Sequence, residues 1–164
     1  MRNILLAIAF ILFCISLNAQ TFQVIDLQKA VGFWEGKLTY LDYSSVKPFT
    51  MLANIQLSLT QDKKGYITSY EYPKEPHANS KDTIYVFNKL FGKDPIVEFK
   101  KEEDGDFKFV TEIVGEDGND HKKAVLRYIY LLNSNFYSIT KEVKFDDSDK
   151  WIKRNEYILN RTNY

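Results

Sequence analysis

Hydrophobic and polar residues alternate along most of this chain, and the alternation is clearest from Met51 to Thr60. Every second position from Met51 to Leu59 is hydrophobic, whereas the positions between them are mainly polar. Successive side chains of a β-strand point to opposite faces, so a period of two is typical of a strand with one buried face. The polar segment that follows, Gln61–Gly65, predicts a tight turn.

The same alternation predicts a series of further strands. They cover residues 33–43, 66–72, 83–87, 96–101, 107–114, 123–132, 136–145 and 151–159. Turn-forming Gly, Asn, Asp and Ser residues separate most of them, and residues 73–82 form a longer surface loop. The chain is therefore expected to be all-β, with nine strands that follow one another as a meander.

A meander of this length is expected to close into an antiparallel up-and-down β-barrel, because closure removes the exposed edges of the sheet. Such a barrel needs an even number of strands. A short extra strand around Lys89–Phe91 would make ten. The alternative is eight strands with one segment left outside, so the predicted fold is a barrel of 8–10 strands.

The first 19 residues have the layout of a secretory signal peptide. Arg2 gives a positive start, Ile4–Leu17 is almost wholly apolar, and Ala19 places a small residue before Gln20. Cleavage between Ala19 and Gln20 would leave residues 20–164 as a single domain, secreted or periplasmic. The alternative is a membrane anchor, but a helix needs about 20 apolar residues to cross a bilayer. No membrane insertion is therefore expected after cleavage.

The mature chain would carry little net charge and no cysteine. Without Arg2 it has 21 Lys and Arg residues against 22 Asp and Glu residues, a formal charge of −1. No strong positive field is then present to attract nucleic acid. The one cysteine, Cys14, lies within the signal sequence, so the core of a closed sheet must stabilise the domain without a disulfide. We expect a monomer.

Motifs for catalysis or metal binding are not evident in the sequence. His77 and His121 lie in or beside loops, without the three or four converging ligands of a zinc site. The chain also has no Gly-rich phosphate loop, no Gly-X-Ser-X-Gly elbow and, after cleavage, no cysteine nucleophile. We therefore expect no enzymatic activity, no cofactor and no metal.

Gly32-Phe33-Trp34 opens the first strand and resembles the Gly-X-Trp motif of lipocalins and the wider calycin barrels, here of an exported bacterial type. The resemblance implies that a short helical turn before the motif closes the barrel floor. Residues 22–31 have helical spacing and fit that turn. It also implies that Trp34 packs on the floor under a late basic residue, for which Arg161 is the best match. The chain lacks the lipocalin disulfide and is therefore lipocalin-like; a generic β-barrel or sandwich with a chance Gly-X-Trp is the alternative.

The resemblance also implies a ligand inside the barrel, and the alternation indicates which side chains would line it. Tyr40 and Asp42 share the face of Trp34 and lie nearer the barrel mouth. Tyr70, in the third strand, is a further candidate. One face of the last strand is expected to carry Trp151, Asn155, Tyr157, Leu159 and Arg161.

The predicted function is to bind a small hydrophobic or amphipathic molecule. The candidate ligand contacts are Tyr40, Asp42, Tyr70, Asn155 and Tyr157. Two alternatives stay open. Asp42 is placed to cap the following turn with Ser44 and Ser45. A barrel filled by its own Tyr and Phe side chains, as small barrels often are, would instead be an exported interaction or structural module.

Overall fold

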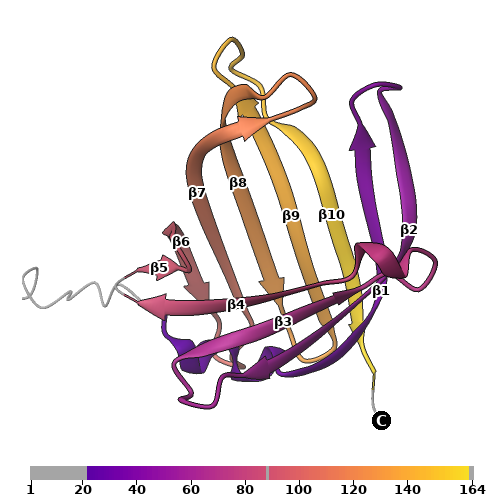
Figure 1. The fold of residues 1–164 in the computed structure, drawn as a ribbon. Coiled ribbons are helices and arrows are strands. Elements are labelled where there is room, and N and C mark those ends of the chain that lie inside the picture. The colour runs from indigo at the N-terminus through magenta and orange to yellow at the C-terminus, as the bar shows by residue number, and fades with distance from the viewer. Residues whose placement is uncertain (1–21, 88, 163–164) are drawn as a thin grey trace, which may run out of the picture.

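The computed structural model is a closed antiparallel β-barrel of ten strands (Figure 1). It describes residues 22–87 and 89–162, so the expected signal peptide, residues 1–19, lies outside the described residues. Each strand pairs with its neighbours in the chain, and the last strand pairs with the first. The predicted all-β antiparallel barrel is confirmed, and so is the short extra strand that brings the count to ten.

Ten strands and two short helices make up the barrel. The strands are β1 (Gly32–Asp42), β2 (Lys47–Leu59), β3 (Gly65–Glu71), β4 (Ser80–Phe87), β5 (Leu90–Phe91), β6 (Asp94–Lys101), β7 (Phe107–Asp117), β8 (Lys122–Leu132), β9 (Phe136–Phe145) and β10 (Ile152–Arg161). The 3-10 helix η1 (Val24–Ala30) precedes β1, and η2 (Pro76–Ala78) lies between β3 and β4. Within the described ranges, no helix has the length and hydrophobicity that crossing a membrane requires.

Some strands extend beyond the predicted limits. β2 begins at Lys47 rather than Met51, because β1 pairs with it as far as Asp42. β7 likewise continues to Asp117, opposite Lys122 of β8. The first four residues of β2 are exposed. A strand tip without a buried face has no hydrophobic alternation to mark it, although its backbone hydrogen bonds continue.

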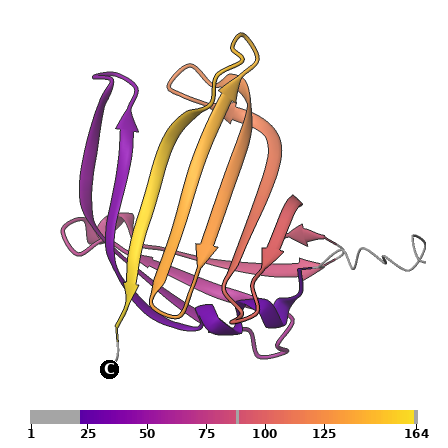
Figure 2. The same ribbon diagram turned by 180° about the vertical axis from the view of Figure 1, so that it is seen from behind.

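The helix η1 closes the lower end of the barrel (Figure 2). Trp34 is fully buried there, and its indole Nε1 donates a hydrogen bond of 2.8 Å to the carbonyl oxygen of Ala30. The hydroxyl of Tyr66 in β3 donates one of 2.6 Å to the carbonyl oxygen of Val24. The guanidinium carbon of Arg161 lies 4.3 Å from the centre of the Trp34 ring. The contact expected between Trp34 and Arg161 is therefore present, and it joins η1 to the first and last strands.

Gly32 makes room for the Arg161 guanidinium. Its φ of +135° is one that other residues rarely adopt, and a Cβ at this position would lie 2.8 Å from Nη1 of Arg161. Arg161 also donates hydrogen bonds to the backbone carbonyls of Val31, at 3.0 Å, and Ser134, at 2.8 Å, and to that of Lys29. A side chain at position 32 would displace the guanidinium from these partners.

Aromatic side chains fill the lower half of the barrel. The rings of Phe109 and Tyr130 stack with their centroids 4.2 Å and their planes 4° apart. The ring centroid of Phe22, which precedes η1, lies 4.6 Å from that of Phe109. The same cluster includes Phe91, Phe99 and Phe107. This part of the barrel is packed rather than hollow.

Only six of the strands continue above this packed half. β2 pairs with β3 over Asn54–Leu59, and β7 pairs with β6 over Phe107–Thr111. Beyond these ranges β2 extends through Lys47–Ala53 and β7 through Glu112–Asp117. In Figures 1 and 2, β7 to β10 and the β1–β2 hairpin form a curved wall above β3 and β4. The upper wall is therefore interrupted between β2 and β7.

Candidate functional site

The strand register places one continuous row of side chains on the inner face of the upper wall. Cross-strand partners in an antiparallel pair project to the same face. The row, here called the upper row, consists of Thr111, Tyr128, Lys141, Asn155, Tyr40 and Phe49, from β7 to β2. Five of these side chains carry a hydroxyl, an amide or an ammonium group, so the upper row is mainly polar.

The row directly beneath it is more hydrophobic. This lower row consists of Phe109, Tyr130, Ile139, Tyr157, Leu38 and Met51. Phe109 is fully buried, and Ile139 and Leu38 are at least nine-tenths buried. By the same count only two lower side chains, Tyr130 and Tyr157, carry a polar group, so the inner surface becomes more polar over one step along the strands.

Four of the predicted ligand contacts lie in or beside these rows. Tyr40 and Asn155 are direct cross-strand partners in the upper row. The rings of Tyr70 and Tyr157 lie 5.8 Å apart, and the Tyr157 hydroxyl lies 2.6 Å from that of Tyr72. The fold brings these side chains to one region of the inner face, while their role toward a ligand stays a prediction.

Partly buried tyrosines give this region neutral hydroxyl groups. Burial is the main cause that raises the pKa of Tyr70, and burial followed by the hydrogen bond with Tyr72 raises that of Tyr157. Burial likewise raises the pKa of Tyr128 in the upper row. These phenols therefore stay protonated and can donate a hydrogen bond at neutral pH.

Asp42 makes the turn contacts that the alternative interpretation expected. Its carboxylate accepts hydrogen bonds from the backbone N–H of Ser44, at 2.9 Å, and the hydroxyl of Ser45, at 2.7 Å. These bonds, with that from Ser45 first, lower the pKa of the Asp42 carboxyl. Asp42 therefore stabilises the turn after β1, and a role in ligand binding stays a prediction.

A cluster of charged side chains lies above the upper row and was not predicted from the sequence. The Asp117 carboxylate accepts hydrogen bonds of 2.7 Å from both Lys141 Nζ and the Tyr43 hydroxyl. The Nε atom of Arg154 lies 3.6 Å from the same carboxylate, and its guanidinium carbon lies 4.1 Å from the centre of the Tyr43 ring. The side chains of Asp117 and Lys141 are only 12% and 14% exposed, so this is an interior cluster.

A bulge in β10 explains why Arg154 faces inward. The register of β10 against β9 shifts between Lys153 and Asn155, which inserts one residue and changes the parity of the strand. The expectation that Trp151 shares the inner face was wrong for the same reason. Trp151 instead lies on the outer face, with the guanidinium of Arg127 3.7 Å from its ring centre.

Arg127 belongs to a separate ion cluster on that outer face. Its guanidinium contacts Glu112 of β7 at 2.7 Å and Glu142 of β9 at 3.5 Å. Arg127 and Arg154 are thus two strand arginines with similar partners, each against a ring and a carboxylate, on opposite faces of the same wall.

The Asp117 contacts predict a pH dependence of stability. Burial raises the pKa of the Asp117 carboxyl, but the hydrogen bonds from Lys141 and Tyr43 outweigh burial and hold the pKa below 3.8. A carboxyl with a lowered folded-state pKa stabilises the fold above its unfolded-state pKa, and this stabilisation is lost as pH falls through the folded-state value. Asp117→Asn should therefore lower the urea midpoint at about pH 6, and its difference from wild type should shrink below about pH 4. If the urea midpoints of wild type and Asp117→Asn differed as much below about pH 4 as at about pH 6, the ionised Asp117 carboxylate would not be the source of the stabilisation.

Several buried polar atoms in this region have no hydrogen-bond partner within residues 22–87 and 89–162. They are Asp94 Oδ1, Thr111 Oγ1 and Arg154 Nη1. Thr111 belongs to the upper row, and Asp94 is close enough to Tyr128 to raise the pKa of its hydroxyl. Buried polar groups are nearly always hydrogen-bonded in folded proteins. Three buried polar atoms without a hydrogen-bond partner in one region are therefore unusual, and a bound polar group could supply the missing hydrogen bonds.

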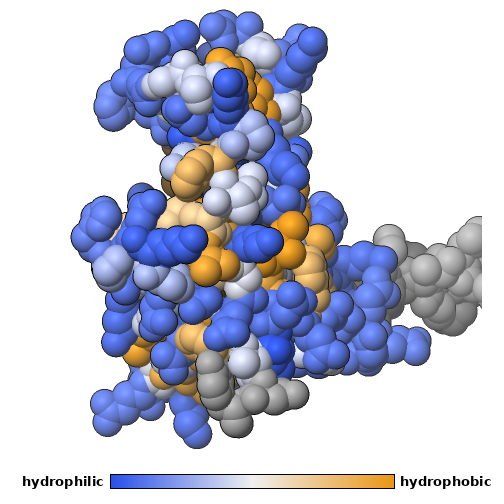
Figure 3. Space-filling model, turned by 90° about the vertical axis from the view of Figure 1, so that its right-hand side faces the viewer, coloured by the Kyte–Doolittle hydropathy of each residue, from blue (hydrophilic) through white to orange (hydrophobic). Residues whose placement is uncertain are grey.

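Hollows on the surface lie beside this region. One of about 260 Å³ at the barrel mouth is lined by Tyr43, Asp117 and residues of the β7–β8 turn. Another, of about 320 Å³, lies beside β2, where Phe49 and Leu52 are 48% and 44% exposed. Figure 3 shows hydrophobic surface at a narrow waist on the side that carries the β1–β2 hairpin.

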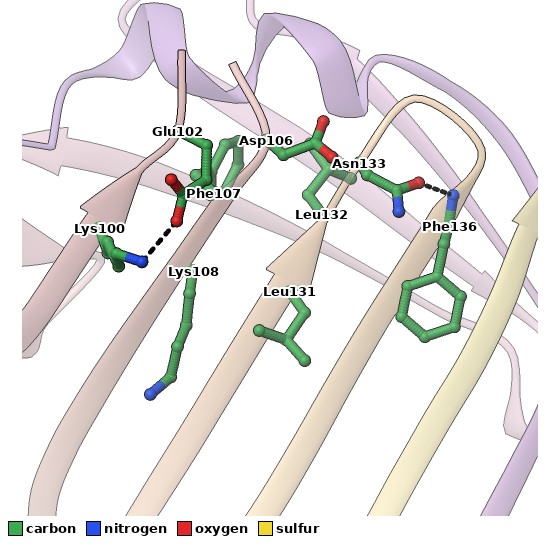
Figure 4. A pocket seen from close by; sticks show the side chains of 9 residues that line it. All are labelled: Lys100, Glu102, Asp106, Phe107, Lys108, Leu131, Leu132, Asn133 and Phe136. Carbon is green, nitrogen blue, oxygen red and sulfur yellow. Dashed lines mark hydrogen bonds and ion pairs between the residues drawn. The ribbon is translucent and has the colours of Figure 1, made fainter. Parts of the chain in front are cut away.

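A third hollow, of about 300 Å³, lies near the floor on the outside of β7 to β9 (Figure 4). The side chains of Lys108, Leu131 and Phe136 do not converge on a shared point there. Lys100 forms an ion pair with Glu102, which belongs to the same lining. This hollow therefore lacks the converging polar groups of a binding site, and the inner face of the upper wall is the better candidate.

In the part of the chain that the structure describes, no group of three or more His, Cys, Asp or Glu side chains is arranged to hold a metal ion.

No protein-family model matches the chain, and no curated protein matches it. Among solved structures it is similar to the crystal structure of Rv2717c from M. tuberculosis. The two are 12% identical, with a TM-score of 0.49, and the match covers 87% of this chain and 100% of the other.

Proposed function

We propose that this protein is an exported, lipocalin-like barrel that binds a small, partly apolar molecule in its upper half. The observation that carries the proposal is the change on the inner face from the hydrophobic lower row to the polar upper row. Binding sites for small molecules combine a mainly hydrophobic lining with a few placed polar groups. The apolar part of the ligand would lie on the lower row, and its polar part would reach the upper row.

The unpaired polar atoms support the same proposal. Thr111 is fully buried, and its hydroxyl oxygen has no partner among the described residues. A buried polar group without a partner costs about 1–3 kcal/mol. A ligand hydroxyl or amine that reaches Thr111 and Asp94 would offset this cost, which a barrel built only as a rigid module would carry without benefit.

The interruption of the upper wall supports a lateral route of entry. Residues Lys47–Ala53 of β2 and Glu112–Asp117 of β7 extend beyond their pairing with β3 and β6. The exposed Phe49 lies at the β2 end of the upper row, next to Tyr40, with ring centroids 5.5 Å apart. A partly apolar molecule would meet hydrophobic surface at this side before it reaches the interior.

The export part of the proposal rests on the sequence of residues 1–19. We expect the mature protein to begin at Gln20, because the charged, apolar and small-residue regions all place cleavage after Ala19. N-terminal sequencing of protein from the periplasm or medium of its host would check this. Recovery of the chain from a membrane fraction with Met1 retained would contradict it.

Ligand binding predicts a specific loss in Tyr40→Ala. We expect this change to weaken binding about tenfold, because a buried aromatic contact often contributes 1–2 kcal/mol or more. The measurement is a fluorescence titration with a panel of apolar probes and with extract of the host. Tyr85→Ala is the matched control, since Tyr85 lies on β4 and is 48% exposed. Equal binding by wild type and Tyr40→Ala would count against the site.

The packed lower half favours the second candidate, an interaction or structural module without a ligand. The stacked rings of Phe109 and Tyr130 leave this half filled. The same titration separates the two candidates. Wild-type protein that binds no member of the panel and nothing in host extract would make the module the better account.

A further inference from the structure

We propose that the free edge of β2 at Lys47–Ala53 binds an extended, acidic segment of a partner protein, which would add a strand to the upper wall. In this mode of recognition, the backbone N–H and C=O groups of a sheet edge form hydrogen bonds with those of a peptide. The inference goes beyond the proposed function, because the edge lies at the side of the barrel and needs no ligand in the interior.

The upper part of β2 has a neighbouring strand on one side only. β1 pairs with β2 in unbroken register as far as the pair Asp42 and Lys47. β3 pairs with β2 only over Asn54–Leu59. Within residues 22–87 and 89–162, no other strand pairs with Lys47–Ala53. This segment is therefore an open strand edge.

The backbone groups of Thr50 and Leu52 face the open side of this edge. Alternate residues of an antiparallel strand direct their N–H and C=O groups to the same side. Thr60, just after β2, donates its N–H to the carbonyl oxygen of Gly65 at the start of β3, at 3.0 Å. The same parity directs Thr50 and Leu52 toward the β3 side, above the point where the pairing ends. Pro48 shares this parity, so its missing N–H removes no hydrogen bond to β1.

A hollow follows this edge. The hollow of about 320 Å³ beside β2 is lined by Phe49 and Met51, which belong to the inner face, and by Thr50 and Leu52, which belong to the outer face. Because side chains of both faces line it, the hollow lies along the edge of the strand. Phe49 and Leu52 are both exposed there. An incoming strand would therefore cover hydrophobic surface while its backbone pairs with β2.

The loop after β3 closes the far side of the hollow. Lys74 and Glu75 of this loop complete the lining. The backbone N–H of Glu75 donates to the carbonyl oxygen of Tyr72, and that of Ala78 donates to Glu75, both at 2.9 Å. The loop thus bonds to itself and supplies no strand to β2. The space between the edge and the loop, here called the slot, lies beside the β1–β2 hairpin in Figures 1 and 2.

The charges of the slot favour an acidic segment. Its lining contains Lys37 and Lys74 but only one carboxylate, that of Glu75. Neither lysine forms an ion pair within the described ranges of the chain. Lys37 is the Cα partner of Leu52, so its side chain lies on the outer face beside the edge. A carboxylate on the outer face of an added strand would therefore meet a lysine.

The carboxylates nearest to the slot do not fill this position. Glu35 and Glu71 are the Cα partners of Asn54, which lies nearer the floor than the slot, and neither belongs to the lining. Glu156, on the neighbouring β10, forms an ion pair of 2.9 Å with Lys153. The slot itself therefore carries a net positive charge.

A second copy of this chain fits the slot less well than an acidic segment. Two β2 edges paired about a two-fold axis would bring the lysines of both slots together, and like charges that face each other destabilise a strand pair. Lys47 and Pro48, at the tip of β2, are residues that proteins place on strand edges to prevent self-association. A partner strand with acidic side chains outward and hydrophobic side chains inward would instead meet Lys37 on one face and Phe49 on the other.

The test uses the peptide fluorescein-Val-Glu-Val-Glu-Val-Glu-Val-amide, whose binding is measured by fluorescence polarisation at low ionic strength. We expect wild type to bind it at least about tenfold more tightly than the same peptide with Lys in place of Glu. Two further peptides carry backbone N-methyl groups on either the Val or the Glu residues, which blocks one hydrogen-bonding edge of the peptide. Only one edge can face β2, so one methylated peptide should lose about tenfold in affinity and the other about twofold or less.

Variants of the protein locate the site. Leu52→Pro and Leu52→Ala both remove the leucine side chain, but only proline removes the N–H that faces the slot. We expect Leu52→Pro to bind the peptide about tenfold more weakly than Leu52→Ala does. Lys74→Glu should weaken binding about fivefold, whereas Lys64→Glu, an exposed position in the β2–β3 turn outside the slot, should leave it unchanged.

Each possible outcome decides for or against the edge site. Failure of wild type to bind the peptide, equal affinity for the Glu and Lys peptides, or equal effects of the two methylations would overturn the inference. A wild-type dimer in analytical ultracentrifugation that Leu52→Pro dissociates would assign the edge to a second copy and also overturn it. Far-UV circular dichroism checks folding, and if Leu52→Pro does not fold, the methylated peptides and Lys74→Glu still decide. The probe panel and host extract decide the proposed function separately.

Discussion

Replacing Trp34 by alanine is expected to lower the free energy of unfolding by about 3–5 kcal/mol, the usual cost of removing a fully buried aromatic side chain. Trp34 is 0% exposed. The change would leave a cavity between β1 and η1 and remove the hydrogen bond from the indole to Ala30. It would also leave the guanidinium of Arg161 without the ring over which it lies. The loss of η1 from the floor would follow.

The sequence contains only one other tryptophan, which provides the control. Trp151 lies on the outer face against Arg127 and Lys144, so Trp151→Ala should cost about 1 kcal/mol or less. Urea unfolding followed by far-UV circular dichroism measures both variants. Similar urea midpoints for Trp34→Ala and wild type would contradict the packing of Trp34 against η1 at the closed end of the barrel.

Gly36→Ala is expected to destabilise the barrel by about 2–3 kcal/mol, or more, because β1 and β10 would have to separate. A Cβ at position 36 would lie 2.0 Å from the carbonyl oxygen of Ile158 and 2.9 Å from the Cα of Leu159. Both atoms belong to the backbone of β10, which cannot move aside as a flexible side chain can. Gly36 pairs with Leu159 two residues above Trp34, so the change would strain the seam that closes the barrel.

Gly115→Ala is the matched control for this seam. There the nearest atom is a terminal methyl group of Leu126, at 3.1 Å, which a small rotation of the side chain would relieve. We expect a cost of about 1 kcal/mol or less. Thermal and urea midpoints of the two alanine variants would test the difference. If Gly36→Ala were as stable as Gly115→Ala, the backbones of β1 and β10 could not lie as close together at Gly36 as the structure has them.

The sequence was sufficient to predict how the barrel closes. Period-two alternation marks a strand wherever one face is buried, as from Met51 to Leu59. The need for an even number of strands pointed to a short strand around Lys89–Phe91, where the structure has β5, which is too short for any periodicity to show. Antiparallel closure then places the end of β10 beside the start of β1, which brings Arg161 opposite Trp34.

The charged cluster was harder to predict, for reasons that differ among its residues. A signal for Lys141 existed, because it shares strand parity with the buried Ile139 and Val143. Asp117 lies beyond the predicted end of its strand and looked like part of an acidic turn. Arg154 faces inward only because of the bulge after Lys153, and a bulge leaves no pattern in a single sequence.

The division between a packed lower half and a polar upper half depends on long-range pairing. β2 leaves β3 at Asn54, and β7 leaves β6 at Thr111, although each strand continues without a break in its own sequence. Alternation shows that Tyr40 faces inward, but not which partners surround it. The register between strands was needed to place Tyr40 beside Asn155 and Phe49.

A packed floor and a polar upper row have a common consequence for binding. Trp34, Arg161 and the stacked aromatic rings pack together in the lower half. The six upper strands continue from that half, so the proposed site on their inner face would be preformed. A preformed site loses less conformational entropy on binding, which favours affinity for a small molecule.

Native mass spectrometry of the protein purified from its own host tests the central claim most directly. We predict a species heavier than the mature chain by the mass of one small molecule, which denaturation in organic solvent releases. Tyr40→Ala, purified in the same way, should retain markedly less of it. Wild-type protein found only at the mass of the bare chain, and unable to take up any molecule from host extract, would contradict the claim that the upper half of the barrel binds a ligand.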